Sequence, residues 1–181
     1  MIIDKEKLIF IHIPKNAGTS ISSCFSTQRI KQPRKHASIE EIKNEFPTEY
    51  KTYRKFAIVR NPYDRMVSYF FYLKRNNNYY VRDIGFKEWL NYLVNIKKQN
   101  TNNSELQKTF TQNSWVDNTV NILRFENLEK EISNFLKKEI KLPKINTSNH
   151  QGSVEYYDED SLNNIYNIFK EDFEKFNYKK L

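Results

Sequence analysis

The sequence holds little cysteine, histidine, glycine or proline. Its single cysteine, Cys24, excludes an internal disulfide and a cysteine-based zinc cluster. The three histidines, His12, His36 and His150, are spaced unlike a metal site. With three glycines and five prolines in 181 residues, no Gly/Ser/Pro-rich run marks a linker. We therefore expect a reducing compartment, no bound metal, and one domain over residues 1–181.

Long apolar runs are also scarce, and acidic residues are fewer than basic ones. The N-terminal apolar run covers only residues 8–13, too short for the core of a signal peptide or for a membrane span. We therefore expect a cytoplasmic protein without a membrane span. The 22 acidic residues are outnumbered by 30 lysines and arginines, giving a formal charge of +8. This charge favours an anionic partner without choosing among nucleic acid, a phosphorylated cofactor, an acidic polymer and a membrane surface.

Apolar runs and amphipathic segments alternate along the chain. Ser38 and Glu41 form a capping-box pattern, and Asn61 followed by Pro62 is a typical helix start. The patterns predict strands at 8–13, 55–60 and 120–125 and helices at 19–28, 38–46, 62–74, 86–96, 127–138 and 159–177. This alternation predicts an α/β fold with a central parallel sheet flanked by helices. Ligands of such sheets bind at the carboxyl ends of the strands.

The first predicted strand ends in the sequence PKNAGTS, residues 14–20. Gly18 permits close backbone approach or a positive φ, and the next two residues carry hydroxyls. Together with the Lys15 ammonium and the amides of the following helix, they would form an anion cradle. An ordinary strand-to-helix turn with a solvated lysine is the alternative. The lysine precedes the glycine, so the full P-loop pattern of nucleotide triphosphatases is absent.

The second predicted strand lies in FAIVRNPYDRMVSYF, residues 56–70. Arg60 ends the strand, where its guanidinium could grip a phosphate through two parallel hydrogen bonds. Ser68, two turns into the next helix, could add a hydroxyl. Taken singly, Arg60 could form a surface ion pair and Ser68 could fill a helix face. Beside a lysine-bearing anion loop on a neighbouring strand, they indicate two phosphate sites for one cofactor.

At these two motifs the sequence resembles the sulfotransferases that use 3′-phosphoadenosine 5′-phosphosulfate (PAPS), in particular the carbohydrate O-sulfotransferase branch. FIHIPKNAGTSI resembles the 5′-phosphosulfate loop of that family, and residues 56–70 resemble its 3′-phosphate motif. Segments 122–132, 142–148 and 165–178 are similar to later segments of the branch in order and spacing. The resemblance covers nearly the whole chain. It implies a P-loop-like sulfotransferase fold and transfer of a sulfuryl group from PAPS to a hydroxyl, with 3′-phosphoadenosine 5′-phosphate (PAP) as the product.

The resemblance also implies roles for individual residues. Lys15 would contact the bridging oxygen and the sulfate, while Arg60 and Ser68 would hold the 3′-phosphate. The backbone and side chains around the 5′-phosphosulfate would be those of Asn16, Ala17, Gly18, Thr19 and Ser20. Candidates for contacts with the adenosine are Lys144, Asn146 and Ser148.

His36 is the candidate catalytic base. An attacking sugar hydroxyl must lose its proton, and a histidine within hydrogen-bonding reach commonly accepts it. His36 stands in RKHASIEEI, which resembles the branch's histidine segment followed by a helix. By itself, a histidine after KQPRK could be a solvated loop residue. The implied acceptor is an oligosaccharide or polysaccharide, whereas His12, inside the first strand, is expected in the core.

Two other functions are compatible with parts of the sequence. A nucleotide or small-molecule kinase with a variant phosphate loop would need magnesium and an acidic ligand, for which Asp64 is the nearest candidate. A nucleic-acid-binding module would need a basic stripe with exposed aromatic residues. The lysines are instead scattered and paired with glutamates on the predicted helices. We therefore expect no nucleic-acid partner.

Overall fold

The computed structural model describes residues 1–25, 30–31, 34–79, 81–98, 111–143 and 153–181. The chain divides into two compact units, the first from Met1–Arg60 and Gln112–Asn146 and the second from Asn61–Thr111 and Thr147–Leu181. The sequence-based expectation of one domain stays a prediction. Within the described ranges, no helix has the length and apolar character needed to cross a membrane.

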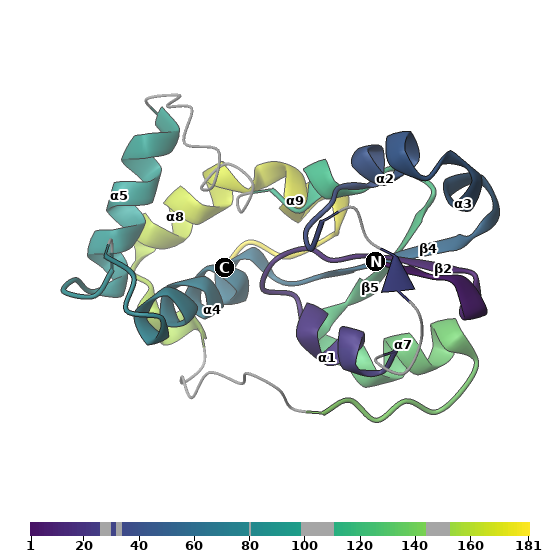
Figure 1. The fold of residues 1–181 in the computed structure, drawn as a ribbon. Coiled ribbons are helices and arrows are strands. Elements are labelled where there is room, and N and C mark those ends of the chain that lie inside the picture. Colours follow the sequence, from purple (N-terminus) through teal and green to yellow (C-terminus); the bar gives the residue numbers. More distant parts are fainter. Residues whose placement is uncertain (26–29, 32–33, 80, 99–110, 144–152) are drawn as a thin grey trace. The chain divides into compact units, whose positions relative to one another are not determined.

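The first unit contains a five-stranded sheet in the order β3-β1-β2-β4-β5 (Figure 1). The strands are β1 (Ile2–Ile3), β2 (Leu8–Ile11), β3 (Ile30–Lys31), β4 (Arg54–Val59) and β5 (Val120–Arg124). Strand β4 is parallel to β2 on one side and to β5 on the other. The sequence LIFI of β2 and the last four residues of β4, FAIV, are wholly apolar, as expected for parallel strands that are covered on both faces.

Helices cover both faces of this sheet. The first unit has helices α1 (Gly18–Ser23), α2 (Ile39–Glu45), α3 (Pro47–Thr52) and α7 (Leu128–Leu136), with the short 3-10 turns η1 (Asp4–Glu6), η2 (Asn113–Trp115) and η3 (Phe125–Asn127). In Figure 1, α1 and α7 lie on one side of the sheet and α2 and α3 on the other. Phe10, Phe56, Ile21 and Ile132 are among the buried residues that pack between the sheet and α1 and α7. The fold is therefore α/β, with a central, mostly parallel sheet flanked by helices, as predicted.

The antiparallel edge of the sheet was not predicted. Strand β1 pairs antiparallel with both β2 and β3. The turn η1 and Lys7, whose φ of 49° lies in the left-handed region, reverse the chain between β1 and β2. A two-residue strand has no readable alternation of polar and apolar residues, so the sequence pattern could not reveal it.

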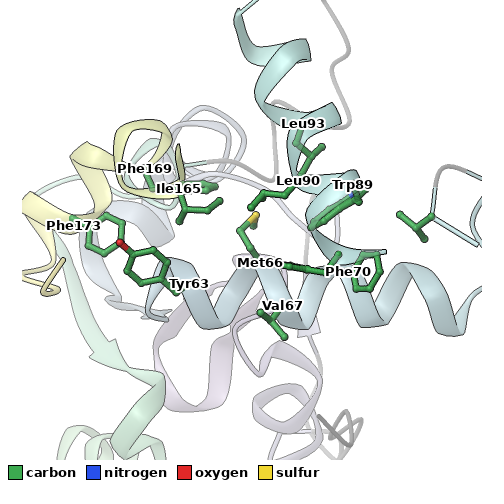
Figure 2. Packing of buried hydrophobic residues seen from close by; sticks show 12 residues of the cluster. Tyr63, Met66, Val67, Phe70, Trp89, Leu90, Leu93, Ile165, Phe169 and Phe173 are labelled. Carbon is green, nitrogen blue, oxygen red and sulfur yellow. The ribbon is translucent and has the colours of Figure 1, made fainter. Parts of the chain in front are cut away.

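The second unit is helical and contains its own apolar core (Figure 2). Its elements are α4 (Pro62–Arg75), α5 (Phe86–Lys98), η4 (Ser153–Tyr156), α8 (Glu159–Ile168) and α9 (Lys170–Lys175). Tyr63, Met66 and Phe70 of α4 pack with Trp89 of α5 and Phe173 of α9. A hydrogen bond also reaches α4 from the segment before α8, because the hydroxyl of Tyr157 donates to the carbonyl of Tyr63 at 2.9 Å. This buried tyrosine-rich core holds α4, the helix that carries Ser68.

Most helix boundaries agree with the sequence patterns. Ser38 and Glu41 form both hydrogen bonds of the predicted capping box, and Asn61 caps α4 with Pro62 in its first turn. Helix α1 ends earlier than predicted, at Ser23, because Cys24 and Phe25 donate their amide protons three residues back and tighten the last turn. The helices predicted near 159–177 are α8 and α9, which are separated at Phe169. Helix α3 was not predicted.

Candidate functional site

The loop after β2 has an unusual backbone. Lys15 and Ala17 adopt left-handed φ angles of 70° and 57°, which cost about 1 kcal/mol or more for residues other than glycine. Asn16 between them is almost fully buried, at 1% exposure. Its side-chain amide donates to the carbonyl of Ile58 on β4 at 2.7 Å and to Oε1 of Gln112 at 2.6 Å. Asn16 therefore anchors the loop, while Lys15 and Ala17 remain partly exposed beside it.

Arg60 directly follows the last residue of β4, so it lies at the carboxyl edge where the sequence predicts it. Its guanidinium Nη1 donates to the carbonyl of Lys15 across 3.4 Å, and its Cζ lies 4.1 Å from the centre of the Phe125 ring. Both backbone groups of Arg60 are bonded to the side chain of Gln112, each at 2.9 Å. The structure therefore brings Lys15 and Arg60 together in the first unit, with two cationic side chains at one edge of the sheet.

Gly18 begins α1 and lies against the imidazole of His12. A Cβ atom at position 18 would lie 1.7 Å from Nε2 of His12, a distance that no side chain could tolerate. Gly18 itself has no positive φ. Of the two roles predicted for this glycine, the structure shows close approach, and the group that it approaches is His12. His12 is buried, as predicted, and stacks on Phe10 with ring centres 5.7 Å apart.

His36 lies beside the end of β2, although it is 24 residues further along the chain. Its Nδ1 is 2.9 Å from the carbonyl oxygen of His12, and the two imidazole rings meet edge to face with centres 4.5 Å apart. The buried ring of Trp115 also meets His36 edge to face, with ring centres 6.4 Å apart. Just before α2, Arg34 is ion-paired with Glu41. The candidate base is thus held at the same edge of the sheet as the lysine loop.

The environment of His36 sets its protonation. Because a carbonyl oxygen only accepts hydrogen bonds, Nδ1 must carry the proton, and the lone pair of the neutral ring then lies on Nε2. Burial lowers the pKa of His36 below its ordinary value of 6.5, the charges of Lys35 and Arg34 lower it further, and the bond to His12 opposes them. The imidazole is therefore neutral at pH 7, the form that a general base requires.

The other predicted residues lie in several places. Thr19 is exposed and Ser20 is buried on α1. Ser68 belongs to the second unit, where it is buried on α4 at 7% exposure. The candidate adenosine contacts Lys144, Asn146 and Ser148 lie outside the described residues, as does His150. A cavity of about 340 Å³ in the second unit is lined by polar side chains of α5 and the start of α8, and none of the predicted site residues lines it.

Sequence reasoning missed three residues of this site. Gln112 contacts both the lysine loop and the end of β4, Trp115 packs against His36, and Phe125 lies against the guanidinium of Arg60. Phe125 stands at the predicted end of the third strand, which could have placed it at the same edge. No local pattern distinguishes Gln112 from the other polar residues around it, because its partners are distant in sequence.

Comparison with known proteins identifies a family. The family model described as the sulfotransferase family matches residues 1–179, which is nearly the whole chain. No curated protein and no solved structure matches the chain at a significant level. The match covers both the lysine loop and the segment that carries Arg60.

Replacing Gly18 with alanine should destabilise the first unit. The new methyl group would overlap the imidazole of His12, and overpacking of this kind costs about 1–3 kcal/mol. Urea unfolding of Gly18→Ala measures the loss. Gly85→Ala is the matched control, because a Cβ there has no neighbour within 4 Å. Adding His12→Ala to Gly18→Ala should restore part of the stability, and a Gly18→Ala protein as stable as the Gly85→Ala control would contradict the contact.

The burial of His12 should make the protein less stable in mild acid. Burial lowers the pKa of His12 to about 3, so between pH 6.5 and 3 the unfolded chain binds a proton that the folded chain does not. Stability should therefore fall as the pH drops, by about 2 kcal/mol between pH 7 and 5 from this group. Urea unfolding at both pH values should show a smaller drop in His12→Phe. Equal drops in the two proteins would rule this out.

Proposed function

The chain belongs to the sulfotransferase family, and from that premise we propose that it transfers the sulfuryl group of PAPS to a hydroxyl of a carbohydrate and releases PAP. The observation that carries the proposal is the meeting of Lys15 and Arg60 at the carboxyl edge of β2 and β4, with His36 at the end of β2. In the reaction, a bond forms between the acceptor oxygen and sulfur, and the bond from sulfur to the phosphate oxygen breaks. The acceptor's proton leaves to a base.

The described residues fit a ligand with two anionic ends. Lys15 and Arg60 supply positive charge, and the exposed Thr19 supplies a hydroxyl beside the loop. Arg60 is set in a fixed orientation by Phe125 and by its bond to Lys15. A guanidinium held in this way suits a phosphate, because its planar fork matches two phosphate oxygens. Ser68, in the middle of α4 in the second unit, would add a hydroxyl for the 3′-phosphate, as the resemblance implies.

In this proposal Lys15 acts on the leaving group. Negative charge grows on the bridging phosphate oxygen as the bond to sulfur breaks, and the ammonium of Lys15 would stabilise it. An interaction that strengthens in the transition state raises the turnover rate, and the part already present in the bound ligand adds affinity. The left-handed backbone at Lys15 and Ala17 sets the direction in which the side chain of Lys15 leaves the loop.

His36 would take the proton of the acceptor hydroxyl at Nε2. Its Nδ1 proton is held by the carbonyl of His12, so the same tautomer is retained before each reaction. After transfer the imidazole carries the positive charge until it returns the proton to water. A general base of this kind contributes about 10²–10⁴-fold to the rate.

The proposal also includes the class of acceptor and the location of the protein. A carbohydrate acceptor follows from the branch that the sequence resembles, and the formal charge of +8 would favour an acidic one. Incubation with radiolabelled PAPS and a panel of neutral and acidic oligosaccharides tests the acceptor class, and transfer only to a non-carbohydrate hydroxyl would reject this part. The cytoplasmic location stays a prediction.

The protein should bind PAP more tightly than ATP in the presence of a chelator. ATP lacks the 3′-phosphate that Arg60 would hold, and no magnesium is needed. Arg60→Lys keeps the charge but loses the fork, so its affinity for PAP should fall by about 10-fold or more. Arg54→Lys is the matched control, since Arg54 stacks on Phe135 at the other end of β4. Calorimetry that shows tighter binding of ATP than of PAP would contradict the assignment of PAPS as the donor.

The variants His36→Ala and Lys15→Ala should separate the two steps. His36→Ala should retain affinity for PAP while turnover falls by about 10²-fold or more, whereas Lys15→Ala should lose both. In the wild type the rate should rise with pH as His36 loses its proton, at a pH below 6.5 because its pKa is lowered. This rise of the rate with pH should be absent in His36→Ala. If that variant keeps most of its turnover, the base is another group.

A further inference from the structure

We propose that Gln112 is a positioning residue that holds the lysine loop and Arg60 at a fixed spacing. It lies in the first unit just before η2, and none of its surface is exposed. The inference rests on the proposed function, because the spacing matters for a ligand that carries phosphates at both places. Gln112 does not itself touch the reacting atoms in this proposal.

The first part of the argument is that Gln112 takes the place of a neighbouring strand. Its Oε1 accepts from the amide of Arg60 and its Nε2 donates to the carbonyl of the same residue, each at 2.9 Å. Strand β2 pairs with β4 only as far as Ile11 opposite Ala57, so the ladder between them stops before Arg60. Buried backbone groups need partners, and a side-chain amide offers the donor and the acceptor that a strand would offer.

The second part is that the side chain of Asn16 also takes the place of a neighbouring strand, at Ile58 of β4. Ile58 and Arg60 are two residues apart on one extended chain, so their backbone groups point to the same edge. The amide of Asn16 donates to the carbonyl of Ile58 at 2.7 Å and to Oε1 of Gln112 at 2.6 Å. Oε1 of Gln112 therefore accepts one proton from the loop after β2 and one from the end of β4. A single oxygen atom joins the two candidate phosphate-binding segments.

The third part of the argument is that the bond between Gln112 and Asn16 holds the strained backbone of the lysine loop. Lys15 and Ala17, on either side of Asn16, have left-handed backbones that persist only where the surroundings hold them. Asn16 is the buried anchor of this strained turn, and Gln112 holds Asn16. Loss of Gln112 would leave polar groups of Asn16 and Arg60 buried with fewer partners, and the loop could then relax toward ordinary φ angles. The ammonium of Lys15 would shift relative to the guanidinium of Arg60.

A change in this spacing has a specific signature. A ligand with one phosphate binds at one of the two segments and is little affected by their separation. PAP carries phosphates at both ends of the nucleoside and needs both segments at once. The ratio of the affinities for PAP and adenosine 5′-monophosphate therefore reports the spacing, and a general loss of stability leaves this ratio unchanged.

The experiment compares two substitutions of Gln112 with a matched control. Gln112→Met keeps the length of the side chain and removes the hydrogen bonds to Asn16 and Arg60, while Gln112→Glu keeps the Oε1 acceptor and loses the donor to Arg60. Ile132→Ala is the control, because it removes a buried side chain of α7 in the same unit. Calorimetry gives the affinities for both nucleotides, and hydrogen exchange without ligand reports the amide of Arg60.

We expect amide exchange at Arg60 to become about 10-fold faster or more in Gln112→Met, because the acceptor of its proton is lost. The affinity ratio should fall by about 10-fold in the same variant, by less in Gln112→Glu, and not at all in Ile132→Ala. If Gln112→Met does not fold, the fall of the affinity ratio in Gln112→Glu decides, because this variant loses the donor to the carbonyl of Arg60 and retains the acceptor of its amide proton.

The outcomes separate this inference from the proposed function. A wild type that does not prefer PAP to adenosine 5′-monophosphate contradicts the proposed function, and the exchange of Arg60 still decides whether Gln112 holds the strand end. A wild type with the preference, together with Gln112 variants that retain the full ratio, overturns the inference alone. Unchanged exchange at Arg60 in Gln112→Met overturns it as well.

Discussion

The candidate site depends on the way the carboxyl end of β4 is completed by two buried amides. A parallel strand that outruns its neighbour leaves polar backbone groups without partners, and Asn16 and Gln112 supply them at Ile58 and Arg60. Because these bonds are buried, they are stronger than bonds exposed to water and more costly to break. They allow the chain to leave the sheet after β2 and after β4, which are neighbouring strands. Lys15 and Arg60 follow these two strand ends.

A second constraint, the close contact between Gly18 and His12, determines how His36 is oriented. The absence of a side chain at Gly18 lets the imidazole of His12 lie close to the start of α1, and the carbonyl of His12 lies 2.9 Å from Nδ1 of His36. One histidine is thus buried for packing, and its backbone orients another whose ring is only partly covered. The two have different roles because burial suppresses protonation far more at His12.

The sequence predicts those parts of the molecule whose causes are local. The capping box at Ser38 and Glu41 and the start of α4 at Pro62 involve neighbours within one turn, so the pattern alone identifies them. Apolar runs likewise predict the three parallel strands, and strand ends predict where Lys15 and Arg60 lie. The pairing of Gln112 with Asn16 depends on two distant segments, and β1 is too short to carry a pattern, so the sequence indicates neither.

The first unit is assembled from two stretches of chain, which are separated by Asn61–Thr111 of the second unit. Gln112 and β5 follow that insertion, and Arg60 and Gln112 are 52 residues apart. Bringing such segments together costs the conformational entropy of a long loop before the contacts between them form. This slows folding. The edge that holds Lys15 and Arg60 is therefore completed only when β5 docks beside β4. A ligand that needs this edge stabilises the docked chain alone, so its presence favours completion of the sheet by mass action.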